Sequence, residues 1–296
     1  MEVMTMNNMT ALVSCFARAY HYRTNQTHIF SDEAAYPILG SDYETVSSHM
    51  KQGIPYFLPG FEGSDEDGLQ LIADWQLSPS VLGRSAFCEA KLHMSADNGC
   101  EQYLILAPGY DTFGIRKKEV IPYVFELDLP EIIEDKKERI QKAGLASVSL
   151  YVPCDLSDQR WKNTLLNAGF NSGRMTFASM QGISYYLSND SFVNLLNTLN
   201  SLLTDHSELC FDFPSDDEGR EAGVTRDLAQ AAGEAMQACY SVSEMTEILD
   251  RCGYRIRTML GPEEMTEIYF SEYNRNVRGR TMEAPKGVRY VHAIGK

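Results

Sequence analysis

From Glu101 onward the chain alternates short apolar runs with longer amphipathic stretches, and this alternation limits the possible folds more than any other feature. The apolar runs are rich in β-forming residues, whereas the stretches between them show helical spacing. Strands that alternate with helices build a mainly parallel sheet. The strand-like runs are YLILA from Tyr103, YVFELD from Tyr123, SVSLYVP from Ser147, RMTFASM from Arg174 and LCFDF from Leu209.

Helix signals follow several of these runs. The stretch 130–144 begins with proline and ends with glycine, a pairing typical of a helix and its C-terminal cap. Ser191–Leu203 places its apolar residues on one helical face, and Ser243–Gly253 is typical of a capped helix. We expect Tyr254–Met259 and Gly287–Ile294 to close the sheet as strands, with an antiparallel pairing.

The residues before Glu101 are expected to be mainly helical. Thr10–Tyr20, Ser31–Leu39 and Gly83–Met94 show helical spacing of apolar side chains. Gly53–Gly68 concentrates glycine, proline and acids, so it predicts a long irregular connection, either a lid or a surface loop.

These patterns together predict an α/β fold of one compact unit. A helical cap, residues 1–98, precedes a Rossmann-like core, residues 99–296, with a mainly parallel seven-stranded sheet and an antiparallel closing strand. A chain of 296 residues with 44% apolar composition can bury such a core.

Charge and cysteine usage narrow the class of protein. The formal net charge of −15 repels phosphate backbones and anionic lipids, so neither nucleic acid nor a membrane is an expected partner. The acidic clusters Glu62–Asp67 and Asp212–Glu221 are expected to be solvated loops. Seven cysteines without a CxxC pair argue against a zinc site and a disulfide framework. With no signal peptide and no membrane-length apolar run, we predict a cytoplasmic protein.

A turn and an acid indicate a nucleoside cofactor. The strand-like Gln102–Leu106 is followed by Ala107-Pro108-Gly109, and ligands of open α/β sheets bind at such strand ends. Asp128 follows Gly109 by 128 − 109 = 19 residues, where a ribose-binding carboxylate is expected. Asp111 and Thr112 could cap the next helix.

Further polar residues lie after later strands. Glu126 and Asp128 project to one side of their strand, which is costly unless they meet a ligand, a cation or water. Asp155 could accept a hydrogen bond from an adenine amino group. Tyr185 and Tyr186 follow another strand and could form either a buried aromatic wall or part of a site.

Five segments, in order and spacing, resemble the leucine carboxyl methyltransferase family. Its polyketide carboxyl O-methyltransferases of tetracenomycin type are also similar, and SCFARAYHYRT and IYFSEYNRNVRGR resemble the two ends of that branch. The match covers most of the chain. The five segments are GRSAFCEAKL from Gly83, QYLILAPGYDTF from Gln102, VFELDLPEIIEDKKE from Val124, VPCDLSD from Val152 and QGISYYLS from Gln181.

The resemblance implies a class I methyltransferase that binds S-adenosylmethionine and uses no metal. It implies that Arg84 clamps the methionine carboxylate and that Asp128 binds the ribose. Asp155 and Leu156 match the adenine contacts. The other cofactor-binding residues that match are Ala107, Gly109, Asp111 and Gln181.

Three positions depart from the family pattern. Ala107 replaces the first glycine of the turn, which an alanine tolerates if its φ is negative. Gln181 stands where the family usually has glutamate, and Phe113 where bacterial members commonly have arginine. These departures bear on cofactor affinity more than on the fold.

We predict an S-adenosylmethionine-dependent O-methyltransferase that acts on a carboxylate or hydroxyl of a small molecule, as in secondary metabolism. A protein C-terminal carboxyl methyltransferase is the alternative, followed by a nicotinamide-dependent oxidoreductase and a binding protein without turnover. A carboxylate acceptor needs no general base, whereas a phenol would benefit from one, so no catalytic residue is assigned. His21 and His28 are not expected to act as a base. Candidates for the acceptor site are Arg18, Tyr20, Arg23 and Tyr185.

Overall fold

The computed structural model describes residues 6–216, 238–277 and 279–296, with the backbone alone for residues 6–8. The second acidic cluster, 212–221, therefore lies partly outside the described residues. The described strands are β1 Gln102–Leu106, β2 Tyr123–Asp128, β3 Ser149–Pro153, β4 Thr176–Met180, β5 Glu208–Pro214, β6 Tyr254–Leu260 and β7 Val288–Gly295.

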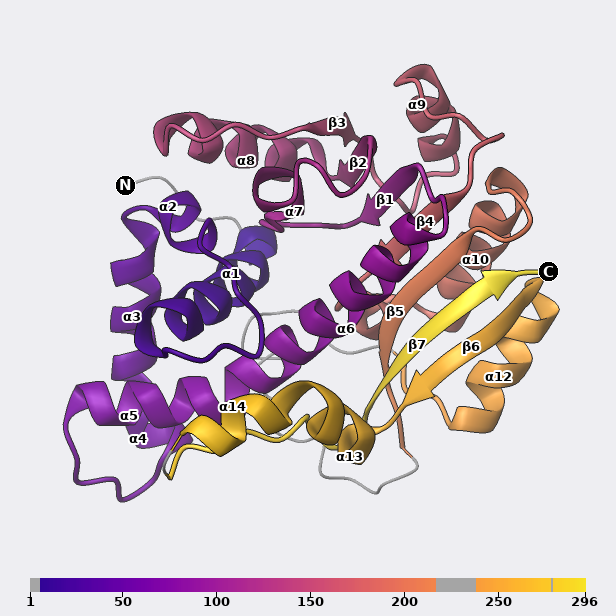
Figure 1. Cartoon of the computed structure of the whole chain (residues 1–296). Helices are drawn as coiled ribbons and strands as arrows, with labels where there is room; N and C mark the ends of the chain where they lie inside the picture. Colours follow the sequence, from indigo (N-terminus) through magenta and orange to yellow (C-terminus); the bar gives the residue numbers. More distant parts are fainter. Residues whose placement is uncertain (1–5, 217–237, 278) are drawn as a thin grey trace.

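The seven strands form one sheet in the order β3-β2-β1-β4-β5-β7-β6 (Figure 1). Strands β1 to β5 pair in parallel, and β7 runs antiparallel to both β5 and β6. The predicted mainly parallel sheet with an antiparallel closing strand is confirmed. All five residues of β1 are buried, because helices cover both faces of the sheet at its centre.

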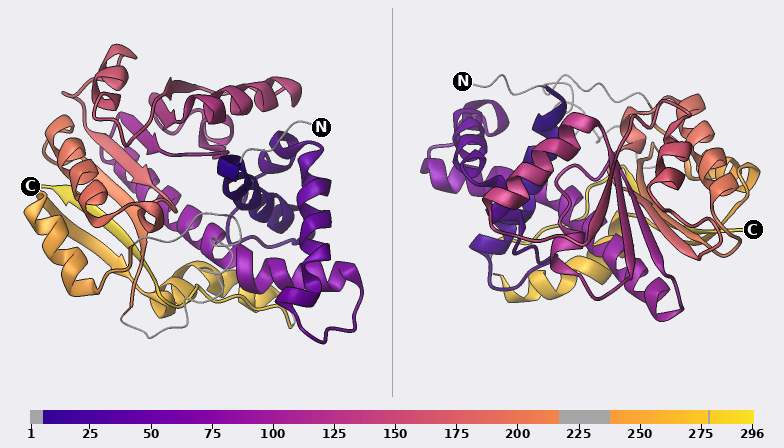
Figure 2. Two further views of the ribbon diagram at one scale, coloured as in Figure 1. Left: turned by 180° about the vertical axis from the view of Figure 1, so that it is seen from behind. Right: turned by 90° about the horizontal axis from the view of Figure 1, so that it is seen from above.

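Alternate residues of the strands contribute to two separate cores. On one face, α9 (Trp161–Asn167), α10 (Asn189–Leu202) and α12 (Val242–Arg251) pack against the sheet. On the other face, α6 (Ser78–Asp97) packs together with the C-terminal α13 (Pro262–Met265) and its neighbours (Figures 1 and 2).

The N-terminal helices stand beside the sheet and form a third core together with Tyr110, Ile115 and Ile140 of the remaining chain (Figure 2). The long helix α6, which the predicted boundary at residue 98 groups with the cap, packs on both the sheet and α1. The cap elements are α1 (Met6–Thr24), α2 (Ala35–Leu39), α3 (Asp42–Gln52), α4 (Ile54–Phe57), α5 (Asp65–Ile72) and the π-helical turn η1 (Ala73–Leu77).

Hydrogen bonds and ion pairs fix the cap to the rest of the chain. Arg18 on α1 donates through Nε to Asp32 Oδ2 at 2.8 Å and through Nη2 to the carbonyl oxygen of Tyr110 at 2.7 Å. Asp32 also accepts from the Thr112 hydroxyl at 2.7 Å. Elsewhere in the cap, Asp74 Oδ2 in η1 accepts from Nε and Nη2 of Arg280 near the C-terminus. The cap is thus held by segments far apart in the sequence.

The expectation of an irregular connection at Gly53–Gly68 is wrong in part. Ile54–Phe57 is helical, and α5 begins at Asp65. The Ser64 hydroxyl accepts from the backbone N–H of Asp67 at 3.2 Å, and the acids of the first turn favour the positive end of the helix dipole. The acidic run that suggested a loop is therefore a helix start.

The turn after β1 departs from what the sequence led us to expect of Ala107. Its φ is +50°, in the left-handed region, and not negative. Its backbone N–H donates to the carbonyl oxygen of Leu127 on β2 at 2.8 Å, which holds the residue in that conformation. For an L-residue this conformation costs about 1–2 kcal/mol. The chain therefore retains backbone strain at the turn that follows its central strand.

Replacing Ala107 by glycine should relieve this strain. Glycine adopts a positive φ freely, but it also raises the entropy of the unfolded chain, so we expect a net stabilisation of about 0.5–1 kcal/mol. Urea denaturation monitored by circular dichroism measures the change. Ala143→Gly is the matched control: with φ at −77°, that alanine is unstrained, so its replacement should destabilise. Destabilisation by both substitutions would contradict the strain at Ala107.

Candidate functional site

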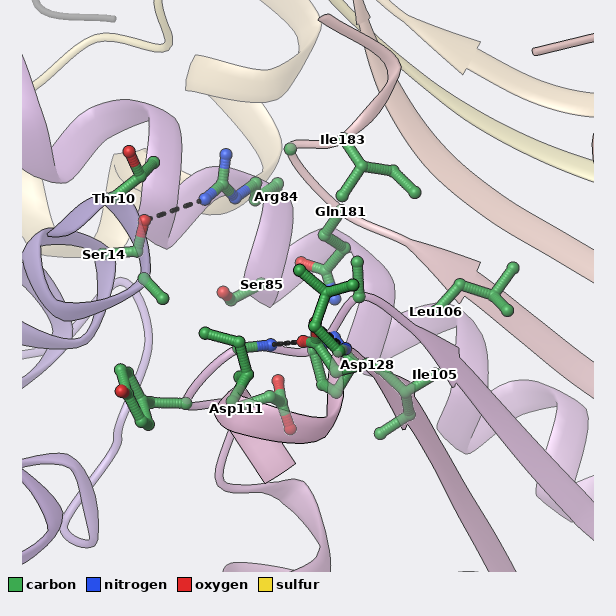
Figure 3. Close-up of a pocket in the computed structure, with 18 of the residues that line it drawn as sticks. Thr10, Ser14, Arg84, Ser85, Ile105, Leu106, Asp111, Asp128, Gln181 and Ile183 are labelled. Carbon is green, nitrogen blue, oxygen red and sulfur yellow. Dashed lines mark hydrogen bonds between the residues drawn. The ribbon is translucent and has the colours of Figure 1, made fainter. Parts of the chain in front are cut away.

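A cavity of about 220 Å³ opens at the carboxyl ends of β1, β2 and β4, and we call it the cofactor cavity (Figure 3). It lies where the strand order reverses between β1 and β4, the usual ligand position of open α/β sheets. Its wall opposite the strands comes from α1 and α6. The polar residues in its lining include Thr10, Ser14, Arg84, Asp111, Asp128 and Gln181.

Asp128, the last residue of β2, fixes the glycine turn. Its Oδ2 accepts from the backbone N–H of Gly109 at 2.8 Å, and its Oδ1 accepts from the N–H of Leu129 at the same distance. Burial raises the pKa of the Asp128 carboxyl, while these two N–H groups oppose the rise. The carboxylate lines the cofactor cavity, and further donors, such as a pair of ribose hydroxyls, can approach its remaining lone pairs.

Glu126 has a separate, structural role although it projects to the same side of β2. Its carboxylate pairs with the buried ammonium of Lys136 on α8 (Pro130–Lys142) and accepts from the Ser149 hydroxyl at 2.6 Å. It does not line the cofactor cavity. Of the two acids, only Asp128 is therefore placed to bind a ligand there.

Arg84 reaches the cofactor cavity from α6 because residue 182 has no side chain. Gly182 has φ +70°, and a Cβ built there would lie 2.4 Å from Arg84 Nη1. The guanidinium donates through Nη2 to the Ser14 hydroxyl at 3.3 Å (Figure 3). Its Nη1 lies 3.9 Å from Asp212 Oδ2, which is close enough for an ion pair but not for a hydrogen bond. Among the residues that the structure describes, several of its N–H groups are therefore left for an anionic ligand.

Asp212 on β5 organises the segment that follows β4. Its carboxylate is buried and accepts from the N–H of Gly182 at 2.7 Å and from the Tyr185 hydroxyl at 2.9 Å. Burial, together with the charge of Asp212, raises the pKa of Tyr185. Asp212 therefore sets the position of the glycine against which Arg84 packs.

A second cavity of about 370 Å³ lies inside the helical cap, and we call it the cap cavity. Its surface is mainly apolar, and most of its lining residues come from α1, α3, η1 and α6. Its volume falls in the range of small-molecule sites. Five residues line both cavities and form a shared wall: Thr10, Ser14, Arg84, Gly182 and Tyr186.

The structure brings together six of the eight residues predicted for the cofactor. Asp155 and Leu156 do not line the cofactor cavity; Asp155 is exposed and accepts from the N–H of Ser157 at 2.8 Å. The six that line it are Arg84, Ala107, Gly109, Asp111, Asp128 and Gln181. Asp111 accepts from the N–H of Phe113 at the start of α7 (Phe113–Arg116), whereas Thr112 bonds to Asp32 instead of capping that helix.

The residues predicted for the acceptor lie mainly elsewhere. Arg18 lines the cofactor cavity, but its guanidinium is engaged by Asp32 and backbone carbonyls. The Cζ atom of Arg23 lies 3.8 Å from the centre of the Tyr36 ring. This cation–π contact holds the arginine against the ring. Tyr20 belongs to the cap core, and the Tyr185 hydroxyl is bound to Asp212. Tyr20, Arg23 and Tyr185 line neither cavity.

Sequence reasoning missed the residues that define the shared wall and the cap cavity. Ser14 and Val13 sit in the predicted helix 10–20, but helical spacing does not say which face meets another element. Gly182 carried a usable signal, since it comes two residues after the buried strand β4 and a glycine there often marks a site that another group approaches closely. No local signal marks Asp212, because its partners lie about 30 residues away.

Within the described residues, no group of His, Cys, Asp and Glu has the arrangement of a metal site. Over the same part of the chain, no helix is long and apolar enough to cross a membrane.

Comparisons with known proteins give a family match and a relative along the whole chain. The family model described as leucine carboxyl methyltransferase matches residues 11–200. The protein YktD of Bacillus subtilis (strain 168), whose name describes an S-adenosyl-L-methionine-dependent methyltransferase, is 30% identical over 305 residues and covers 98% of each chain.

Two solved structures share the fold. A protein from Thermobifida fusca YX that is described as a methyltransferase has a TM-score of 0.58 at 14% identity, covering 97% of this chain and 94% of that one. A DUF574 family protein from Streptomyces avermitilis MA-4680 also has a TM-score of 0.58, at 16% identity, covering 83% and 97%. The predicted Rossmann-like class I methyltransferase fold is confirmed.

Replacing Asp128 by alanine should weaken binding of S-adenosylmethionine and of S-adenosylhomocysteine. The change removes the carboxylate acceptor and releases the N–H groups of Gly109 and Leu129, so we expect a loss of about 1–3 kcal/mol in binding. Calorimetric titration measures it. Asp158→Ala is the control, because Asp158 also accepts a backbone N–H after a strand but lies outside the cavity. Equal losses in both variants would contradict a ribose-binding role for Asp128.

Replacing Gly182 by alanine should displace Arg84. The new Cβ would overlap the guanidinium, so cofactor affinity should fall by about tenfold or more, in addition to a loss of stability. Gly144→Ala is the matched control, since Gly144 has a similar φ of +65° but no atom within 4 Å of the added Cβ. If both variants lose stability equally and both bind cofactor normally, the contact between Gly182 and Arg84 does not matter for binding.

Proposed function

This chain belongs to the leucine carboxyl methyltransferase family and is an S-adenosylmethionine-dependent methyltransferase, and on that premise we propose that it methylates an oxygen of a small molecule. The acceptor group is a carboxylate or a hydroxyl. The single observation that carries this proposal is the pair of cavities that meet at one wall. One cavity has polar groups suited to the cofactor, and the other has a mainly apolar surface formed by the cap helices.

The proposed roles of the cofactor residues follow from their contacts. Arg84 would hold the methionine carboxylate, because its guanidinium faces the cavity with N–H groups to spare. Asp128 would accept from the ribose hydroxyls. Ala107 and Gly109 let the ligand approach the backbone of the turn, with Asp111 fixing the start of α7. Gln181 would offer an uncharged acceptor. Asp155 and Leu156 lie outside the cavity, so their proposed adenine contacts rest on the family resemblance alone.

When bound, S-adenosylmethionine supplies an activated methyl group on a sulfonium. The protein's task is then to align the acceptor and to exclude water. Ser14 and Arg84 in the shared wall position the two ligands relative to each other, and the cap helices cover the acceptor. No step in this scheme needs a metal.

The alternatives lack comparable support. A protein carboxyl terminus would require a groove that can satisfy peptide N–H and C=O groups, whereas most of the cap cavity is apolar. A nicotinamide-dependent oxidoreductase does not fit the family. The tetracenomycin-type branch, a polyketide acceptor and a cytoplasmic location remain parts of the proposal.

Two measurements test the proposed function. Calorimetry should show binding of S-adenosylmethionine and S-adenosylhomocysteine but not of NAD. With methyl-labelled S-adenosylmethionine, label should appear in a small-molecule product from an extract of metabolites. Release of labelled methanol by mild base identifies a methyl ester, whereas an ether keeps its label. Binding without transfer to any small molecule, or transfer only to intact protein, would contradict the proposal.

A further inference from the structure

We propose that the methyl acceptor carries a second polar group, a hydrogen-bond donor, that binds Gln76 in the cap cavity at a distance from the methylated oxygen. The inference rests on the methyltransferase function proposed above and concerns the part of the acceptor that does not react. It follows from one buried oxygen atom without a partner and from a row of polar side chains that connects it with the shared wall.

The side-chain oxygen of Gln76 is a hydrogen-bond acceptor that is left unused. Gln76 lies in η1 and lines the cap cavity. Its Oε1 atom is buried, and among the residues that the structure describes it has no hydrogen-bond partner. Leaving a buried acceptor unsatisfied costs free energy. A ligand that presents only hydrocarbon at this point keeps water away and retains that cost, whereas a ligand with a donor removes it.

The amide of Gln76 can turn its oxygen toward a ligand because little holds it in place. Within the described part of the chain, its one hydrogen bond runs from Nε2 to the carbonyl oxygen of Phe57 and is long, at 3.4 Å. The last torsion of a glutamine side chain is broad, so the amide rotates at low cost. The contact with Phe57 also identifies the nitrogen, since an amide oxygen in that place would meet a second carbonyl oxygen.

Gln76 begins a row of polar side chains on the helical segment that lines the cap cavity. Gln76, Ser80 and Arg84 follow one another at intervals of four residues, and side chains with this spacing are neighbours on a helix. The row runs from η1 along α6 to Arg84 in the shared wall. Eight residues of α-helix span about 12 Å. An acceptor whose reacting oxygen lies at the wall therefore finds a partner for a second polar group about 12 Å away.

The opposite side of the cap cavity offers no comparable partner. Val13 on α1, Val46 and Met50 on α3, and Phe57 on α4 line it there. A polar group of the ligand placed against such side chains loses its water and gains no hydrogen bond. The second polar group is therefore expected on the side of η1 and α6, with the apolar part of the acceptor facing α1 and α3.

His49 also lines the cap cavity, but it suits this role less well than Gln76. It lies on α3 and is exposed, and its Nδ1 lies 3.0 Å from the carbonyl oxygen of Thr45 on the same helix. An exposed ring is hydrated before the ligand arrives, so a hydrogen bond to it replaces one to water. The buried oxygen of Gln76 has more to gain.

The turn that carries Gln76 is itself unusual. The element η1 is a π-helical turn between α5 and α6, and such turns are rare and frequently lie at functional sites. Its other polar side chain with hydrogen-bonding groups, Asp74, is bound to Arg280, and Trp75 is exposed. Gln76 is therefore the residue of this turn that is available to a ligand in the cap cavity.

The experiment uses the full chain loaded with S-adenosylhomocysteine and two pairs of alcohols. Octane-1,8-diol has a second hydroxyl that octan-1-ol lacks. Pentane-1,5-diol and pentan-1-ol form the short pair, whose chain is too short to connect the shared wall with Gln76. Calorimetry should show octanediol binding at least about fivefold more tightly than octanol. The short pair should differ by no more than about twofold, the statistical advantage of a symmetrical diol.

Variants of Gln76 assign the preference to this side chain. Gln76→Met keeps the side-chain length but removes the acceptor oxygen, so the advantage of octanediol over octanol should fall to about twofold or less. Gln76→Glu keeps an acceptor oxygen and should retain the preference. Gln141→Met is the matched control, because Gln141 is exposed on α8 and lines neither cavity, so its replacement should leave the preference unchanged.

The outcomes separate this inference from the function on which it rests. Equal affinities for octanediol and octanol, an equal advantage in the short pair, or no octanediol binding at millimolar concentration would overturn the second polar group. An unchanged preference in folded Gln76→Met would overturn it as well, and if that variant does not fold, the two alcohol pairs on the unchanged chain decide. A chain that fails to bind S-adenosylhomocysteine would instead overturn the proposed function itself.

Discussion

The contact between Asp128 and the backbone N–H of Gly109 is the interaction on which the rest of the site depends. It joins the end of β2 to the turn after β1, so two neighbouring strands of the sheet share one ligand-binding edge. The N–H of Leu129 binds the same carboxylate. A charged acceptor of backbone N–H groups costs less when buried than an unpaired one, and this explains how the acid is kept 91% buried in a cavity wall.

The cap depends on the same turn. Tyr110 follows Gly109, and its carbonyl oxygen accepts a hydrogen bond from Arg18, which also pairs with Asp32. Asp32 in turn accepts from Thr112. The helices that enclose the cap cavity are therefore anchored to the residues that shape the cofactor cavity. One buried network of hydrogen bonds therefore connects the cap with the turn at the cofactor cavity.

Much of the fold and part of the site could be predicted from the sequence. The strands after Glu101 were visible because a buried parallel strand is a short apolar run between turn signals. Asp128 and the turn were visible because their spacing is fixed by one βαβ unit. The helix start at Asp65 was mistaken for a loop because acids and glycines mark both structures.

What the sequence did not reveal depends on contacts between distant segments. The positive φ of Ala107 is imposed by its hydrogen bond to Leu127, twenty residues away, against the intrinsic preference of alanine. Arg23 could not be separated from a substrate-binding arginine, since its partners Tyr36 and Tyr43 meet it only in the folded cap. The cap cavity likewise exists only between helices.

The shared wall has a thermodynamic consequence for the order in which ligands act. Arg84 lines both cavities, so a ligand that moves its guanidinium or changes its surroundings in one cavity also changes the binding free energy of a ligand in the other. Such a coupling is reciprocal: the factor by which one ligand changes the affinity of the second is the factor by which the second changes the affinity of the first. A change of charge or position in one cavity is therefore felt in the other through this single side chain.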